Sequence, residues 1–171
     1  MTDKERAEIN GLGLEEKVNY SKSIIREALG KFGNNLVLAW TGGKDSTMML
    51  WLYKQTYAEM DKPLPKCIFI NEGDVFDEIL ELIDRVKRMW NIQVVELKND
   101  EVLRNIKVIG DIVKVTGMNE RNRKELEYID FKEKEFPFEP ESYVGNHLMK
   151  TVSVKVFIKE NSIRAANCIP S

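Results

Sequence analysis

Apolar and polar residues fall along this chain in blocks that predict its secondary structure. Short apolar runs without alternation, typical of strands covered on both faces, lie at residues 36–41, 67–71 and 92–97. Stretches with a helical spacing of apolar residues accompany these runs, at residues 14–32, 45–60 and 75–91. This order predicts an α/β fold: a three-layer α/β/α domain with a mainly parallel, doubly wound, Rossmann-like sheet.

The helices after the first two strands have clear apolar faces. The helix at residues 45–60 has an apolar face that is expected to point toward the core, formed by Met49, Tyr53, Tyr57 and Met60. The most regular helix, at residues 75–91, has a predicted buried stripe of Phe76, Ile79, Leu80, Ile83, Val86 and Trp90. After the third strand, Asn99 and Asp100 are expected to cap a short helix that starts at Glu101.

The second half of the chain is less regular. The segment 119–129 contains Arg121, Arg123 and Lys124. Two interpretations of this basic cluster are open: a solvated helix face, which the glutamates between the cations favour, or a clamp on an anionic substrate. The proline-containing segment 136–140 predicts a loop.

One polar stretch between the first strand and the next helix carries the candidate chemistry. It reads Thr41-Gly42-Gly43-Lys44-Asp45-Ser46-Thr47. A glycine turn that opens a helix directs backbone N–H groups and the positive end of the helix dipole at one point, which suits a phosphate. Gly42 and Gly43 let the backbone approach a ligand closely, and Lys44 adds a positive charge. Ser46 or Thr47 can cap the helix or donate a hydroxyl to a phosphate oxygen.

Two better-known glycine motifs do not fit this stretch. The P-loop pattern G-x-x-x-x-G-K-[ST] would place its first glycine at Leu38 and a serine or threonine at Asp45. The dinucleotide fingerprint G-x-G-x-x-G fails because the two glycines are adjacent and no third one follows. Ligands of open α/β sheets bind outside the carboxyl ends of the strands, so residues 41–43, 71–73 and 98–99 are predicted to line one cleft.

Composition narrows the classes of function. The 171 residues suffice for one domain, and a formal net charge of −2 argues against a general nucleic-acid-binding protein. Cys67 and Cys168 form no C-x-x-C pair, and the single histidine, His147, argues against a transition-metal site. Residues 1–13 are expected to be mobile. With no signal-peptide core and no membrane-spanning segment, the sequence predicts a cytoplasmic protein.

The chain resembles the phosphoadenosine phosphosulfate (PAPS) reductase family, within the PP-loop, or adenine-nucleotide α-hydrolase-like, enzymes. The family motif S-G-G-K-D-S corresponds to residues 41–46. A second family feature is a strand that ends in D-T-G and is followed by an aromatic residue and a helix; residues 69–76 correspond to it. A third feature is a segment that contains a lysine, and residues 147–151 correspond to it. The resemblance covers most of the chain from about Ile24 onward and implies a single domain over residues 1–171.

The resemblance implies that the chain binds an adenine nucleotide, namely ATP, adenosine phosphosulfate or PAPS. The residues implied to bind it are Thr41, Gly42, Gly43, Lys44, Asp45, Ser46, Asn71, Gly73 and Lys150. Lys44 and Asp45 are the implied catalytic residues. Backbone N–H groups and Lys44 would stabilise charge on the phosphate oxygens, and Asp45 would help to place Mg²⁺ through water.

Several positions depart from the family pattern. Asn71 and Glu72 replace the usual Asp-Thr. Residues such as Gly145 and Asn146 replace the paired cysteines of iron–sulfur members, so no iron–sulfur cluster is expected. At residues 152–158 apolar and polar side chains alternate, which is typical of a strand, but members of the family have a helix there. We expect the helix.

The end of the chain also differs from the family. Residues 163–169 predict a last strand, with Cys168 as an unreactive core thiol. Neither the family's arginine-bearing loop nor the cysteine tail of its reductases follows before Ser171, so we expect a shortened or truncated domain. An unpaired edge at the last strand would favour a homo-oligomer.

Three interpretations of function remain open. The first is an enzyme of sulfur or nucleotide metabolism that acts at the phosphate or sulfate end of the nucleotide. Transferase or pyrophosphatase-type chemistry at an α-phosphate fits this enzyme better than reduction of a sulfonyl group by an oxidoreductase. The second is a nucleotide-binding module without catalysis, which needs a partner. The third is a true PAPS reductase whose cysteine tail is missing. Neither a nucleic acid nor a membrane is expected as a partner.

Overall fold

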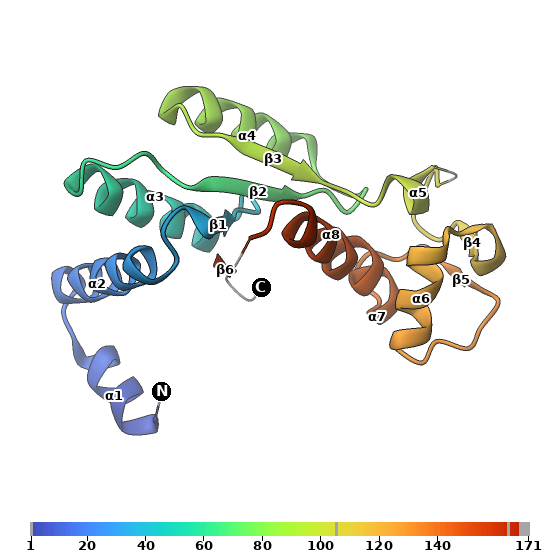
Figure 1. Ribbon diagram of the computed structural model, residues 1–171, viewed down its shortest axis with the longest axis horizontal. Helices are drawn as coiled ribbons and strands as arrows, with labels where there is room; N and C mark the ends of the chain where they lie inside the picture. Colours follow the sequence, from blue (N-terminus) through green and yellow to red (C-terminus); the bar gives the residue numbers. More distant parts are fainter. Residues whose placement is uncertain (1, 105, 164, 168–171) are drawn as a thin grey trace.

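The computed structural model describes residues 2–104, 106–163 and 165–167 (Figure 1). The first part of the chain forms α1 (Asp3–Gly11), α2 (Leu14–Phe32), η1 (Gly33–Asn35), β1 (Leu36–Ala39), α3 (Lys44–Glu59), β2 (Lys66–Ile70), α4 (Asp77–Trp90) and β3 (Val94–Leu97). The second part forms α5 (Asp100–Leu103), β4 (Ile112–Lys114), η2 (Val115–Gly117), α6 (Glu120–Tyr128), β5 (Glu135–Pro137), α7 (Tyr143–Asn146), the π-helical turn η3 (His147–Thr151), α8 (Val152–Glu160) and β6 (Ala165–Asn167).

A parallel sheet with the strand order β3-β2-β1-β6 is the centre of the fold (Figure 1). β1 lies between β2 and β6, with Val37 opposite Lys66 on one side and Ala166 on the other. Leu36, Val37 and Leu38 are all buried. A central strand covered on both faces explains why this apolar run shows no alternation. The predicted parallel sheet is confirmed.

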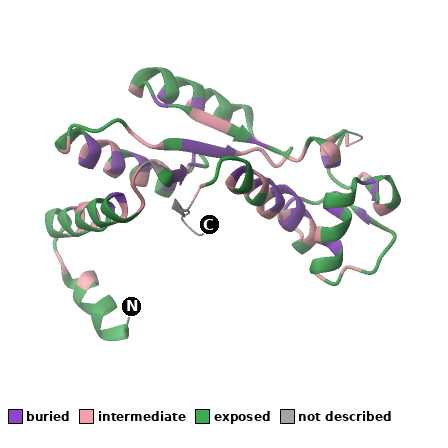
Figure 2. Cartoon of the chain, in the orientation of Figure 1, coloured by how far each residue is buried: buried purple, intermediate pink, exposed green. Residues whose placement is uncertain are grey.

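Helices cover both faces of the sheet, as predicted. On one face, α2, α3 and α4 share a core cluster with β1 and β2, which includes Leu29, Leu38, Tyr53, Phe69 and Ile83. On the other face, α8 packs against the sheet through Val37, Ile68, Leu97 and Phe157. Successive strand residues point to opposite faces, which explains why Val37 and Leu38 belong to different clusters. Figure 2 shows buried residues in β2 and along α3 and α8.

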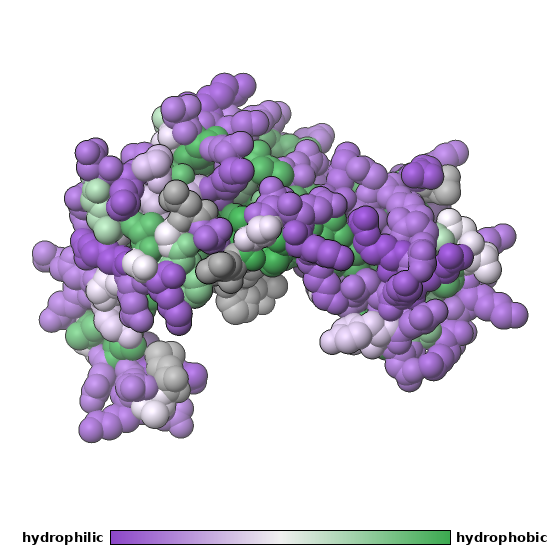
Figure 3. All heavy atoms as spheres, in the orientation of Figure 1, coloured by the Kyte–Doolittle hydropathy of each residue, from purple (hydrophilic) through white to green (hydrophobic). Residues whose placement is uncertain are grey.

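A further core lies beyond the carboxyl ends of β2 and β3 (Figure 1). It joins α5, β4, α6, β5 and η3, and its most buried members are Leu126, Phe138, Leu148 and Met149. β4 and β5 form a separate antiparallel pair. In Figure 3 hydrophobic side chains are visible mainly at the centre of the molecule, and hydrophilic side chains cover much of the surface around this further core.

The structure corrects the predicted buried stripe at residues 75–91. Phe76 is 78% exposed and Leu80 is 36% exposed, so neither is buried. α4 starts only at Asp77, and Phe76 has non-helical backbone angles (φ −59°, ψ 138°), so its side chain does not follow the helical period. Leu80 lines a cavity beside the edge strand β3. Ile83 is buried, as predicted.

The segment 136–140 is not wholly a loop, which corrects a second prediction. Its first two residues belong to β5, where Pro137 lies opposite Ile112 of β4. Proline is tolerated there because each strand of a two-stranded ribbon has a free edge. Residues 152–158 lie in α8, which confirms the expected helix.

The two ends of the chain were predicted less completely. The segment 1–13 contains α1, which opens with a capping box between Thr2 and Glu5 and buries none of its residues. Its mobility stays a prediction. β6 lies within the predicted last strand, whereas Cys168 lies outside the described residues. No helix in the described ranges is long and apolar enough to cross a membrane.

Candidate functional site

The loop between β1 and α3 is fixed at both ends. The backbone N–H of Trp40 donates to the carbonyl oxygen of Ile68 at 2.9 Å, which continues the pairing of β1 with β2. The indole Nε1 of Trp40 donates to Oγ1 of Thr47 at 3.0 Å. Because the Trp40 side chain is fully buried, this bond ties the start of α3 to the core.

Gly42 is the residue on which the shape of the loop depends. Its φ is +78°, a conformation that residues with a Cβ rarely adopt. A Cβ at this position would lie 2.9 Å from Cγ2 of Ile79 in α4. The loop therefore packs directly against the first turns of α4, and a larger residue at Gly42 would disturb both elements.

The hydroxyl of Ser46 holds the loop together from inside. It donates to the carbonyl oxygen of Gly43 at 3.0 Å and accepts the backbone N–H of Thr41 at 3.3 Å. Oγ of Ser46 also lies 3.0 Å from Oγ1 of Thr41, and Ser46 is buried. In the structure, Ser46 stabilises the loop through these hydrogen bonds. Its predicted contact with a ligand stays a prediction.

The start of α3 offers hydrogen-bond donors that the helix itself does not use. The first helical backbone bond is donated by Thr47 to Gly43 at 2.9 Å. Over the described ranges, the backbone N–H groups of Lys44, Asp45 and Ser46 have no acceptor, as expected at a helix N-terminus. The side chains of Lys44 and Asp45 are exposed, and neither forms an ion pair with a described residue. The loop therefore combines N–H groups that lack an acceptor with one exposed cation and one exposed carboxylate.

The end of β2 forms a tight turn next to this loop. Oδ1 of Asn71 accepts the backbone N–H of Gly73 at 2.9 Å, and Nδ2 of Asn71 donates to Glu96 at 2.7 Å. Gly73 has φ +88°, and a Cβ there would lie 2.4 Å from Cδ2 of Leu103. Asn71 and Gly73 thus shape the turn, and their predicted contact with a ligand stays a prediction.

An ion pair that the sequence did not reveal joins this turn to η3. Nζ of Lys150 lies 3.2 Å from Oε2 of Glu72, although the two groups are not aligned as a hydrogen bond. Burial raises the pKa of Glu72; Lys150 opposes this shift, and the nearby charges of Glu141 and Asp74 add to it. The predicted ligand residue Lys150 is therefore already held by a carboxylate.

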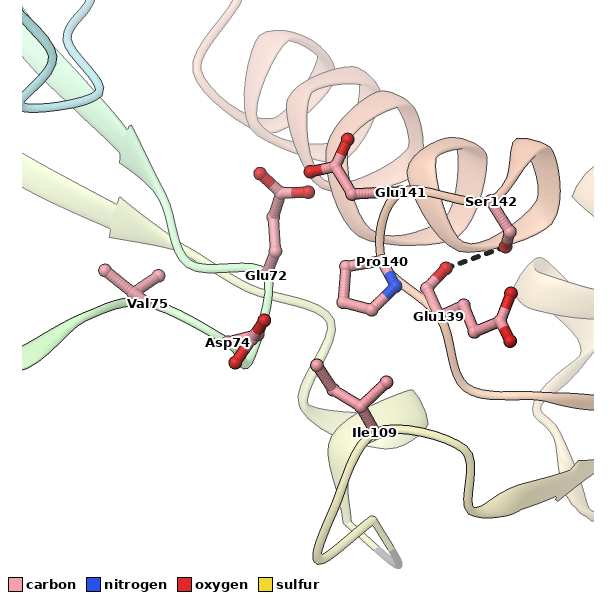
Figure 4. Close-up of a pocket in the computed structure, with 8 residues that line it drawn as sticks. All are labelled: Glu72, Asp74, Val75, Ile109, Glu139, Pro140, Glu141 and Ser142. Atoms are coloured by element: carbon pink, nitrogen blue, oxygen red, sulfur yellow. Dashed lines mark hydrogen bonds between the residues drawn. The ribbon is translucent and has the colours of Figure 1, made fainter.

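A cavity of about 490 Å³ opens beside this ion pair (Figure 4). Its lining is Glu72, Asp74, Val75, Ile109, Glu139, Pro140, Glu141 and Ser142. Figure 4 shows the carboxylates of Glu72 and Glu141 close together on one side. This cavity is not lined by residues 41–43 or 98–99; Lys98 and Asn99 line a separate cavity. That the three strand ends line one cleft stays a prediction.

His147 has a structural partner. Its Nε2 lies 2.9 Å from Oε2 of Glu125, which also accepts Nζ of Lys155 at 2.7 Å. Burial acts to raise the pKa of Glu125, but the hydrogen bonds from Lys155 and His147 outweigh it and lower that pKa. Within the described ranges, no three His, Cys, Asp or Glu side chains are grouped to hold a metal ion.

Comparison with known proteins identifies the family. A profile of the phosphoadenosine phosphosulfate reductase domain matches residues 35–166, which include the loop, the β2 turn and Lys150. The chain belongs to the PAPS reductase domain family. Its fold is adenine-nucleotide α-hydrolase-like. A search of curated proteins found no match to this member of the family.

A search of solved structures found partial matches to FMN adenylyltransferase from Candida glabrata. One such structure is a complex with FAD and inorganic pyrophosphate, and another a complex with FMN and the ATP analogue AMPCPP. Each is 21% identical to this PAPS reductase domain, with a TM-score of 0.43 over 68% of this chain. The domain matches 38% of the length of either chain.

Proposed function

We propose that this PAPS reductase domain binds an adenine nucleotide through its phosphate or phosphosulfate end at the loop 41–47. The family supports the class of ligand. The observation that carries the position is the set of backbone N–H groups at the start of α3 that have no acceptor among the described residues. They lie beside the exposed ammonium of Lys44, and together they form an anion-binding helix N-terminus.

The groups at the loop support electrostatic rather than covalent catalysis. The N–H groups and Lys44 would stabilise negative charge that develops on the phosphate oxygens. Asp45 would hold a water molecule of nucleotide-bound Mg²⁺, an ion that keeps several waters and needs few protein carboxylates. This arrangement favours transfer or hydrolysis at the α-phosphate of ATP or adenosine phosphosulfate.

The cysteine that the structure describes supports the same reaction class. Cys67 lies in the central strand β2 and is fully buried. Burial raises the pKa of its thiol to about 12, so Cys67 supplies no thiolate near neutral pH. Reduction of a sulfonyl group would therefore need a thiol from elsewhere.

A second candidate function is nucleotide binding without turnover. The contact between Lys150 and Glu72 favours it, because the carboxylate offsets the positive charge that would otherwise stabilise a reacting phosphate. The hydroxyls of Ser46 and Thr47 are likewise bonded within the loop and its supports.

Calorimetry with ATP, adenosine phosphosulfate and PAPS tests the binding step. Replacing Lys44→Ala should weaken the binding of the preferred nucleotide at least about tenfold, because a charge-assisted hydrogen bond contributes roughly 1.5–3 kcal/mol. Lys62→Ala is the matched control, since Lys62 is an exposed lysine beyond the other end of α3. The proposal fails if none of the three nucleotides binds, or if both variants behave alike.

Product analysis separates the two candidate functions. Pyrophosphate release from ATP, abolished by Asp45→Ala or Lys44→Ala, would establish nucleotidyl chemistry. Sulfite release from PAPS with an added thiol would instead establish a reductase. Binding without either product, with acceptors and thiols supplied, would support the module that does not turn over.

A further inference from the structure

One edge of the parallel sheet has no further strand among the described residues. The strand order places β3 outermost, beside β2 (Figure 1). In β3, Val94 and Val95 are half-buried and Glu96 is exposed, so the rest of the described chain does not fully cover the strand. An exposed edge strand presents main-chain N–H and C=O groups with which another strand can pair.

The hydrogen bonds between β2 and β3 show which residues of β3 face outward. β2 donates to the carbonyl oxygens of Gln93 and Leu97, at 2.9 Å and 2.8 Å. Main-chain groups of alternate residues point to the same side of a strand, so those of Val94 and Glu96 point away from β2. No turn, loop or cap in the described ranges bonds to them. Val94 and Glu96 are therefore the residues that can pair with a new strand.

This outward pair is complementary to itself. In an antiparallel pair of strands, residues that lie directly opposite each other can exchange both of their main-chain hydrogen bonds. With a two-fold axis at Val95, Val94 of each copy lies opposite Glu96 of the other, and both outward residues are paired. An axis at Glu96 would instead place two glutamates opposite each other, which is unfavourable. The edge thus fits a second copy of itself in one register, as an interface between identical subunits requires.

A lysine beside this edge has no ionic partner. A cavity of about 260 Å³ lies between α4 and the sheet, and its lining is Phe69, Asn71, Leu80, Ile83, Asp84, Lys87, Val94 and Glu96. Among the described residues, neither Lys87 nor Asp84 forms an ion pair. Glu96 accepts Nδ2 of Asn71 at 2.7 Å and likewise has no ionic partner. Lys87 is therefore the one cation in the lining, and its charge is not neutralised within the described part of the chain.

We propose that two copies of this chain associate through antiparallel pairing of their β3 strands, which joins the two sheets into one. Residues that lie opposite each other share a face of the sheet, so Glu96 of the second copy lies beside Val94 on the face that α4 covers. Lys87 lines the same cavity as Val94, so this Glu96 comes within its reach. On the face of α8, Val95 lies opposite its counterpart and adds an apolar contact.

The proposal places the association at the edge opposite to β6, whereas the sequence predicted it at the last strand. It does not depend on nucleotide binding.

Sedimentation velocity at increasing protein concentration tests the association. The wild type should shift from monomer to dimer. Lys87→Glu and Glu96→Lys should each weaken dimerisation at least tenfold, because each brings like charges together across the two-fold axis. An equimolar mixture of the two variants should dimerise again, since every such contact then joins a carboxylate to a lysine. Arg88→Glu is the matched control: Arg88 is exposed on α4 outside the cavity lining, and this variant should dimerise like the wild type.

Amide hydrogen exchange on the wild type locates the interface without any substitution, and it decides the question if a variant does not fold. The N–H groups of Val94 and Glu96 should exchange more slowly as the protein concentration rises. The N–H of Val95, which faces β2, serves as the internal reference and should change little. The proposal is wrong if the wild type stays monomeric, if the folded variants do not dimerise when mixed, or if exchange at Val94 and Glu96 is independent of concentration.

Discussion

Replacing Gly42→Ala should destabilise the domain and loosen the loop 41–47. The added Cβ would have to be accommodated at φ +78° and at 2.9 Å from Cγ2 of Ile79. The left-handed backbone costs an L-residue roughly 1–2 kcal/mol, and the contact is tighter than real Cβ atoms show, which adds about 1 kcal/mol as Ile79 shifts. We therefore expect a loss of about 2–3 kcal/mol in the free energy of unfolding.

Urea denaturation followed by circular dichroism measures this loss. The control is Gly30→Ala: Gly30 lies in α2, and a Cβ there would meet nothing within 4 Å, so alanine should stabilise the domain by roughly 0.5–1 kcal/mol. Combining Gly42→Ala with Ile79→Ala removes the crowded methyl group and should cost less than the sum of the two single changes. A Gly42→Ala protein as stable as the wild type would refute the reasoning.

Two other substitutions test the surroundings of the site. Burial raises the pKa of Glu72, so its contribution to stability is fully present below its unfolded pKa and is lost as pH rises through the folded pKa. The stability of the wild type relative to Glu72→Gln should thus fall as the pH rises above 4.5, the ordinary pKa of a glutamate, in urea titrations, and a constant or rising difference would contradict the assignment. Gly145→Ala places a Cβ 1.9 Å from the carbonyl oxygen of Glu139 and should cost about 3 kcal/mol by the same assay. Gly117→Ala, whose Cβ meets nothing within 4 Å, should change stability far less; equal losses would show that the contact at Gly145 relaxes freely.

The alternation of strands and helices up to β3 was predictable from the sequence, because a strand that is buried on both faces has an unbroken run of apolar residues. Leu36 to Leu38 are all buried and all apolar, as a central parallel strand requires. The β4–β5 ribbon could not be predicted in this way, because each of its strands has only three residues, one of them Pro137, which is too few to show an alternation of apolar and polar side chains. Phe76 was wrongly predicted to be buried, because the helical spacing of apolar residues in the sequence begins before Asp77, the residue where the helix starts.

The candidate site was predictable to the extent that it is local. The turn geometry of Gly42 and the helix start at Lys44 are encoded within a few residues, so the motif placed them correctly. The partner of Lys150 was not predictable, since Glu72 is brought to it only by packing of η3 against the end of β2. The substitution of glutamate for threonine at position 72 was the only signal of this contact in the sequence.

Charge is distributed unequally over the carboxyl ends of β1 and β2. At β1, the start of α3 and Lys44 favour an anion. At β2, four carboxylates line the cavity, and Lys150 is paired with one of them, Glu72. Neighbouring strands are only about 4.8 Å apart, so these two environments follow adjacent strands of the sheet. An anionic group is favoured at the loop and opposed at the cavity, where Lys150 is the cation nearest to Glu72 and is already paired with it. The orientation of a bound nucleotide would then follow from this difference in charge.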